Sequence, residues 1–248
     1  IAMEEHHADI VLPIDVDEFL ITASGENPRG VIEALDPLVE HQIPWRTFIR
    51  TSYTEDNEEF LPDGFAKRRA DEVQQFYKTI VSSQMFSENR CTLTAGSHGI
   101  NYPDGSNRRP IQVTSGLFYA HYPIRNSYQA VQKTALSLYS HLIHKRDDRN
   151  CGFQYYDNYE KLIQFGWFSN VDVVNLAKYY AIEQDNQNQI INLIEDQQDP
   201  YAHARPMKLK YTDYGANQKL LMVTLLSQIE EMLTKILDEK EQQSQAIK

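Results

Sequence analysis

Two kinds of hydrophobic pattern divide the chain. Short apolar runs rich in β-branched and aromatic residues predict strands over residues 8–14, 45–53, 76–82, 91–95 and 111–122. Apolar residues spaced three or four positions apart predict helices over residues 29–40, 127–145, 155–168, 171–182, 186–196 and 216–245. We therefore expect an α/β domain that is followed by a helical region.

The first predicted strand runs into three acidic residues, Asp15, Asp17 and Glu18. In α/β sheets ligands bind beyond the carboxyl ends of the strands, so we expect Asp15 and Asp17 at such an edge. Carboxylate oxygens are good ligands for Mg²⁺ or Mn²⁺, and these ions often also hold substrate phosphates. The pattern favours a metal–diphosphate site over an acidic turn that only caps the next segment, although an Asp-x-Asp pair alone has low specificity in an acidic chain.

A second cluster of polar residues follows the last predicted strand. His121 ends that apolar run, Arg125 stands at the entry to a predicted helix, and Lys133 lies two turns further on. Imidazole binds divalent transition ions, and an arginine near a helix N-terminus is well placed for a phosphate. A single histidine is more typical of a hydrogen-bonded core residue, and the two cations of a solvated helix face. Their combination at a strand-to-helix turn favours a functional role.

Charge and cysteine content narrow the class of protein. The formal net charge is −11, with 35 acidic against 24 basic residues, which argues against a nucleic-acid binder but not against a small anionic ligand. The two cysteines form neither a disulfide framework nor a zinc motif, which is typical of a reducing compartment. No apolar run approaches the length of a membrane span. We expect a cytoplasmic protein, either free or at the inner face of a membrane.

The segments "IDVDEFL" and "HYPIRNSYQAVQK" together resemble family 2-type glycosyltransferases of the GT-A fold. The resemblance is to a bacterial subgroup with an Asp-x-Asp-Glu-Phe strand end and a later His-Tyr/Phe-Pro-x-Arg-Ser-x-x-Gln-x-x-x-Lys motif. Asn126 precedes Ser127 and stands where the motif has its serine, a one-residue departure that leaves the spacing of His121, Arg125, Gln129 and Lys133 unchanged. The similarity extends over residues 8–142.

The resemblance implies transfer of a sugar, with inversion, from a nucleotide-diphosphate sugar to a glycan, a lipid-linked acceptor or another cell-surface precursor, as in polysaccharide biosynthesis. It assigns Asp17 and His121 to a Mn²⁺ or Mg²⁺ ion, Asp15 to the ribose or the metal, and Arg125 with Lys133 to the donor. Residues 1–146 would be the carboxy-terminal part of a GT-A-like domain with a mixed sheet, and residues 147–248 a helical appendage. Because the chain opens in what reads as mid-helix, we expect the nucleotide-binding half to precede it.

The catalytic base is left open by the sequence. Glu18, His98 and Asp104 are the candidates, because an inverting transfer needs a base near the acceptor hydroxyl. His98 is flanked by Gly96 and Gly99, where backbone can approach a sugar closely, but it also suits an ordinary turn. Asp104 is better explained by its Asp-Gly turn.

Two other functions remain open at this stage. A metal-dependent phosphohydrolase of the haloacid-dehalogenase type would use Asp15 as its nucleophile, although Glu18 and Phe19 replace the small residue and threonine expected there. A non-catalytic interaction module would use the terminal helix at residues 216–245, whose apolar stripe suits self-association, pairing with another chain or docking on its own domain.

Overall fold

The structure is a computed structural model that describes most of the first half of the chain and parts of the second. The described residues are 2–51, 67–103, 108–125, 127–143, 168–182 and 189–195, with the single positions 158, 162, 164, 228, 229, 231, 234 and 235. The chain divides into two compact units. Unit 1 comprises Ile1–Ile49, Pro62–Pro123 and Ile191–Pro206; unit 2 comprises Arg50–Leu61, Ile124–Ile190 and Met207–Lys248.

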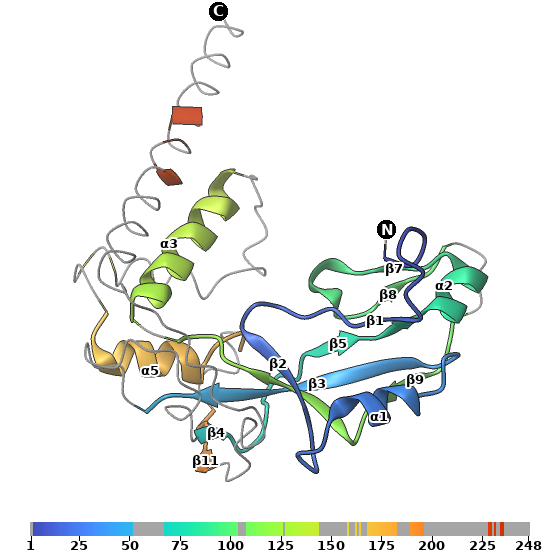
Figure 1. Cartoon of the computed structure of the whole chain (residues 1–248). Coiled ribbons are helices and arrows are strands. Elements are labelled where there is room, and N and C mark those ends of the chain that lie inside the picture. The colour runs from blue at the N-terminus through green and yellow to red at the C-terminus, as the bar shows by residue number, and fades with distance from the viewer. Residues whose placement is uncertain are drawn as a thin grey trace, which may run out of the picture. The chain divides into compact units, whose positions relative to one another are not determined.

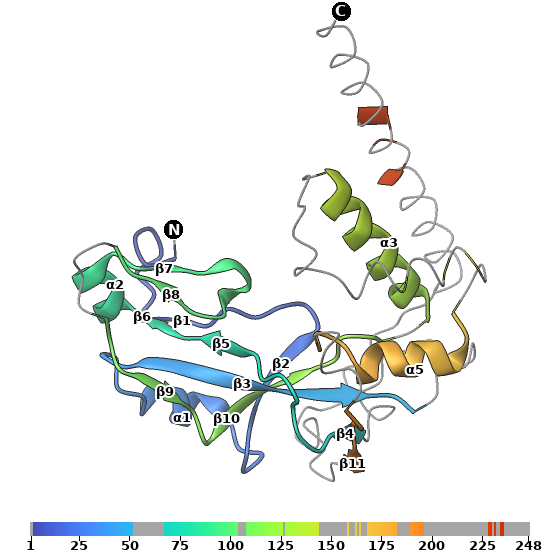
Figure 2. The ribbon, with the colours of Figure 1, turned by 180° about the vertical axis from the view of Figure 1, so that it is seen from behind.

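Unit 1 is built around one long strand, β3 (Glu40–Ile49), as Figure 1 shows. On one edge, β4 (Lys67–Arg69) and β5 (Tyr77–Thr79) pair with it antiparallel. On the other edge, β9 (Ile111–Val113) and β10 (Leu117–His121) run parallel to it (Figure 2). Two separate short strands therefore pair with β3 along each of its edges.

Two further strands complete the sheet. β2 (Glu18–Thr22) pairs antiparallel with β10, and β11 (Leu193–Glu195) pairs antiparallel with β4. The strand order along the main path is β11-β4-β3-β10-β2, which is a mixed sheet with parallel and antiparallel pairs. The α/β prediction with a mixed sheet is thus confirmed for the described part of the chain.

Pro44 explains why the predicted strand over residues 111–122 is divided into β9 and β10. Trp45 donates its backbone N–H to Phe76 on the β5 side, so position 44 faces the opposite edge. β9 ends opposite Gln42, and the first register pair of β10 with β3 is Tyr119 with Trp45. A proline has no N–H to donate, so the ladder is interrupted at a position that cannot supply a backbone hydrogen bond.

Short elements extend one end of unit 1. β1 (Ile10–Val11) pairs with β6 (Val81–Ser82), and β7 (Thr92–Leu93) pairs with β8 (Ile100–Asn101). The sequence analysis missed α2 (Ser83–Asn89), which begins where the Ser82 hydroxyl accepts a hydrogen bond from the Met85 N–H and ends at Arg90 in a left-handed conformation. A 3-10 turn (Ala95–Ser97) separates β7 from β8.

The main core of unit 1 lies between the sheet and the short helix α1 (Pro28–Glu33). Asn27 caps this helix and Pro28 occupies its first turn, which is the usual arrangement at a helix start. In Figures 1 and 2, α1 lies along β3 and β9. The five buried residues of the core are Ile43, Trp45, Ile80, Leu117 and Tyr119, and the α1 residues Val31 and Ile32 pack against them.

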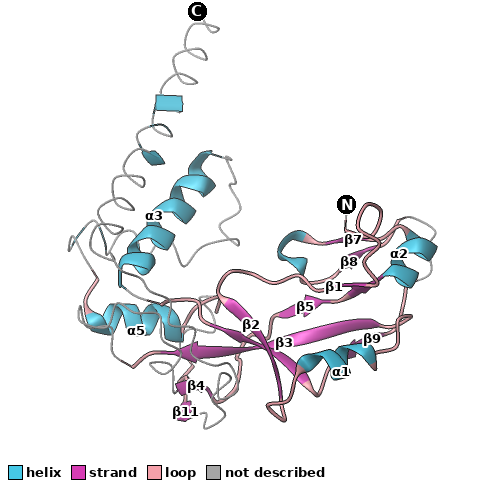
Figure 3. Cartoon of the chain, in the orientation of Figure 1, coloured by secondary structure: helices cyan, strands magenta, loops and turns pink. Residues whose placement is uncertain are grey.

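Unit 2 contains two described helices, α3 (Ser127–Ile143) and α5 (Asn170–Lys178), which appear as ribbons in Figure 3. Ser169 and Asp172 form a reciprocal capping box at the start of α5, which satisfies backbone N–H groups that a helix start otherwise leaves open. Within the residues that the structure describes, no helix combines the length and the apolar character needed to cross a membrane.

Several predicted elements differ from the observed ones. The strand over residues 8–14 is reduced to Ile10–Val11, and the helix over 29–40 ends at Glu33 because the chain turns there into β3. The helix predicted over 186–196 is wrong where described, since residues 193–195 form β11 against β4: a partner strand decides such a short apolar run. The boundary at 146/147, the candidate Asp104, and most of the helices over 155–168 and 216–245 lie outside the described residues.

Truncation of Ile43 tests the central position of β3. The side chain is fully buried, so Ile43→Ala should lower the free energy of unfolding by about 2–5 kcal/mol through lost burial and a residual cavity. Ile111→Ala on β9 is the matched control, because that side chain is 63% exposed and its loss should cost less than about 0.5 kcal/mol. Urea unfolding measures both values, and equal losses would contradict the described core.

Candidate functional site

The acidic residues after β1 form a closed turn rather than a strand end. The Glu18 N–H donates to the Asp15 carbonyl at 3.0 Å, and the Asp15 N–H donates back to the Glu18 carboxyl at 2.9 Å. The turn leads into β2, so Asp15 and Asp17 precede a strand, which corrects the expected position at a carboxyl end. The ladder of β1 ends at Val11, and Pro13 has no N–H with which to extend it.

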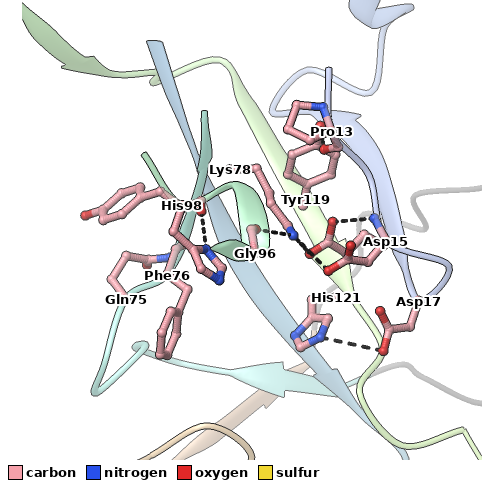
Figure 4. A network of polar contacts seen from close by, with 12 residues as sticks. Pro13, Asp15, Asp17, Gln75, Phe76, Lys78, Gly96, His98, Tyr119 and His121 are labelled. Carbon is pink, nitrogen blue, oxygen red and sulfur yellow. Dashed lines mark hydrogen bonds and ion pairs between the residues drawn. The ribbon is translucent and has the colours of Figure 1, made fainter. Parts of the chain in front are cut away.

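The pairing of β2 with β10 brings Asp17 to His121. Glu18 is the register partner of His121, and the Tyr122 N–H continues the ladder by donating to the Asp17 carbonyl at 2.8 Å. Asp17 Oδ2 then lies 3.9 Å from His121 Nε2, as Figure 4 shows. Both residues are buried. The fold thus brings together two of the predicted site residues that are more than one hundred positions apart in sequence.

Trp45 on β3 joins two of the predicted site histidines. Its ring stacks on His121 with centroids 4.1 Å apart and planes at 26°. The ring of His98 meets the same indole edge-on at 5.7 Å. The candidate metal ligand and the candidate base therefore contact one aromatic side chain, although they come from separate segments.

The hydrogen bonding of His98 suits a base. Its Nδ1 lies 2.7 Å from the Tyr77 carbonyl, and because a carbonyl oxygen can only accept, Nδ1 carries the proton. In the neutral ring, Nε2 is then the nitrogen that carries the lone pair. Gly96 lies directly against this ring: a Cβ at position 96 would come within 2.7 Å of Nε2, and the φ of +70° also favours glycine there. Gly96 was expected to let the backbone approach a sugar closely. In the structure it lets the backbone approach the His98 ring.

Lys78 is the site residue that the sequence analysis missed. It lies on β5 and is 1% exposed, and Figure 4 shows its ammonium between the acidic turn and Gly96. Nζ donates to Asp15 Oδ2 at 2.7 Å and to the Gly96 carbonyl at 2.8 Å, and it lies 3.7 Å from the Glu18 carboxyl. The available signal was a single lysine within the apolar run of residues 76–82, where burial requires a charge partner.

Glu18, the other predicted catalytic residue, is enclosed within this cluster. Burial raises its pKa to about 7, although the Asp15 N–H and the Lys78 ammonium both act in the opposite direction. Its side chain is 0% exposed, so its contacts are with Lys78 and the backbone of the acidic turn. The fold therefore places Glu18 beneath Asp15 rather than at a surface that an acceptor would contact.

The predicted donor-binding residues Arg125 and Lys133 belong to unit 2. The Arg125 N–H donates to the Gln129 side chain at 2.8 Å, which fixes the entry to α3, and its carbonyl accepts from Arg50 at 3.4 Å. The Lys133 ammonium lies 4.4 Å from the centre of the Tyr180 ring, a cation–π contact between α3 and the segment after α5. Arg125 thus lies at the entry to α3, and Gln129 and Lys133 lie within its first turns.

The donor atoms at Asp17 and His121 fit a divalent ion that is shared with a substrate. Ligands at about 2.0–2.2 Å from one ion lie roughly 3–4 Å apart, and the two atoms here are 3.9 Å apart. Asp15, the third predicted ligand, contacts Lys78 instead, and no group of three His, Cys, Asp or Glu side chains suited to a metal occurs among the described residues. One or two protein ligands suffice for an ion that also binds substrate phosphates and water.

The raised pKa of Glu18 predicts a pH-dependent stability. Between about pH 4.5 and 7 the folded protein keeps a proton that the unfolded chain has lost, so stability falls as pH rises through this window, by about 3 kcal/mol in total. Glu18→Gln should remove this fall, as measured by urea unfolding at pH 5 and pH 8. Glu33→Gln, an exposed counterpart on α1, should leave it unchanged. Equal pH slopes for wild type and Glu18→Gln would contradict the assignment.

Comparison with known proteins adds no relative to this geometry. No protein-family model, curated protein or solved structure matches the chain. What the site can bind is therefore inferred from the two sequence motifs and from the contacts that the fold makes between them.

Proposed function

We propose that the chain is part of a metal-dependent glycosyltransferase that moves a sugar from a nucleotide-diphosphate sugar to a glycan or lipid-linked acceptor. The observation that supports this proposal best is the meeting of Asp17 with His121 beside Trp45 and His98. The resemblance motifs lie far apart in sequence, and the pairing of β2 with β10 brings one buried residue of each, Asp17 and His121, face to face. Such convergence of a carboxylate and imidazoles is typical of a site rather than of a solvated surface.

Asp17 and His121 would hold a Mn²⁺ or Mg²⁺ ion in this function. When bound, such an ion would offset the negative charge that develops on the leaving diphosphate. Stacking on Trp45 limits the rotation of the His121 ring and so keeps Nε2 directed at Asp17. Asp15, whose side chain is 57% exposed, provides a carboxylate that a donor hydroxyl group can reach.

His98 is the base that the geometry favours over Glu18. Its Nε2 accepts the proton of the acceptor hydroxyl while that oxygen forms the bond to the anomeric carbon, and the bond from that carbon to the diphosphate oxygen breaks. The hydrogen bond from Nδ1 to the Tyr77 carbonyl holds the ring in the required tautomer. Glu18 lacks the exposure that this step needs.

One observation supports the phosphohydrolase as a second candidate. Asp15 is exposed to an incoming phosphate, and the adjacent Lys78 ammonium would offset the charge of that phosphate. In this reaction an Asp15 oxygen would attack phosphorus and the alcohol would leave, which gives an aspartyl-phosphate. The glycosyltransferase forms no such intermediate, so the two proposals differ in a measurable product.

Nucleotide binding tests the proposed function. Calorimetry with the full-length protein should show that UDP binds with Mn²⁺ at least tenfold more tightly than without it, because the ion links Asp17 and His121 to the diphosphate. Asp17→Asn should abolish this metal dependence. Asp71→Asn makes the same chemical change at an exposed position and should leave it intact.

The opposite results are equally informative. Failure of every nucleoside diphosphate to bind, with or without metal, would overturn the glycosyltransferase proposal. An acid-stable phosphoryl group trapped on wild type but not on Asp15→Asn would establish the phosphohydrolase in its place.

A further inference from the structure

Lys78 has no place in the glycosyltransferase function proposed above, yet it is among the most buried side chains of unit 1. A buried ammonium costs several kcal/mol of desolvation, which only well-placed partners recover. Its three partners come from two separate segments: the acidic turn supplies Asp15 and Glu18, and the 3-10 turn before His98 supplies the Gly96 carbonyl. A lysine at this position therefore links the acidic turn to the segment that carries His98.

The two aspartates of the acidic turn have different surroundings. Asp15 directs Oδ2 at the Lys78 ammonium, while Asp17 directs Oδ2 at His121 (Figure 4). The Asp15 side chain is 57% exposed and that of Asp17 only 12%. The exposed Asp15 carboxylate is thus paired with the buried Lys78 ammonium, and the buried Asp17 carboxylate faces the His121 imidazole.

We propose that Lys78 is a positioning residue that holds Asp15 apart from the metal and leaves Asp17 and His121 as the protein's metal ligands. The proposal rests on the proposed function, because it concerns the ion inferred there. With its charge balanced by Lys78, Asp15 stays fixed as an acceptor for the hydroxyl groups of the donor. The Asp15 carboxylate would then not become a third protein ligand of the metal.

A purely structural ion pair is the alternative role for Lys78. Such a pair would stabilise the fold, and its loss would lower stability without raising the affinity for any ion. The positioning role predicts the opposite sign for metal binding. Removal of the ammonium frees the Asp15 carboxylate and also removes a repulsive charge, so the site should bind Mn²⁺ more tightly.

Binding of Mn²⁺ alone, followed through the electron paramagnetic resonance signal of the free ion, separates the two roles. Lys78→Met should lower the dissociation constant of the full-length protein at least about fivefold. Lys78→Arg keeps the charge and should stay within about threefold of wild type. Asp15→Asn/Lys78→Met leaves the net charge of the site as in wild type and should also stay within about threefold.

If Lys78→Met does not fold, the double variant keeps the proposal falsifiable, because it removes both members of the Lys78–Asp15 pair and reports whether Asp15 is a ligand in wild type. An unchanged or weaker affinity in folded Lys78→Met overturns the positioning role. A tenfold or greater loss in the double variant overturns it too, because Asp15 would then be a ligand in wild type. Failure of wild type to bind any Mn²⁺ overturns this inference, whereas the proposed function is overturned only if no nucleoside diphosphate binds with or without metal.

Discussion

The parallel pairing of β10 with β3 is the constraint on which the rest of unit 1 depends. It places Tyr119 beside Trp45 and His121 beside Thr47, and all five residues of β10 are buried. β2 then adds to the far edge of β10 and carries Asp17 with it. A shift of one residue in this register would turn His121 away from Trp45, since successive side chains in a strand point to opposite faces.

A buried polar cluster completes the end of β3 next to this register. The Thr47 N–H and hydroxyl both donate to the Glu72 carboxylate, which also accepts from the buried Arg69 guanidinium at 2.7 Å. The Glu72 carboxylate thus accepts the Thr47 backbone hydrogen bond that a neighbouring strand would otherwise accept, and Thr47 is the register partner of His121. Because removal of one member of a buried charge pair leaves the other uncompensated, this cluster holds the local backbone in one arrangement.

The electrostatic environment of the acidic turn depends on the side chains that contact it and not on the net charge of the chain. The chain as a whole is strongly acidic, but the acidic turn meets a buried lysine, a stacked histidine and a carboxyl whose pKa burial raises to about 7. The local field is therefore much less negative than the formal charge of the turn implies. This balance allows Asp15 and Asp17, only two positions apart in one turn, to contact different partners.

The sequence by itself determined the α/β class and the choice of the acidic motif and the histidine motif as site candidates. These features depend on local spacing, which the amino-acid order contains directly. It did not determine which short apolar runs become strands, since residues 193–195 form β11 only because β4 offers a ladder. Nor did it identify Lys78, or separate Asp15 from Asp17. Those assignments depend on which segments meet across the sheet, and only the tertiary structure decides that.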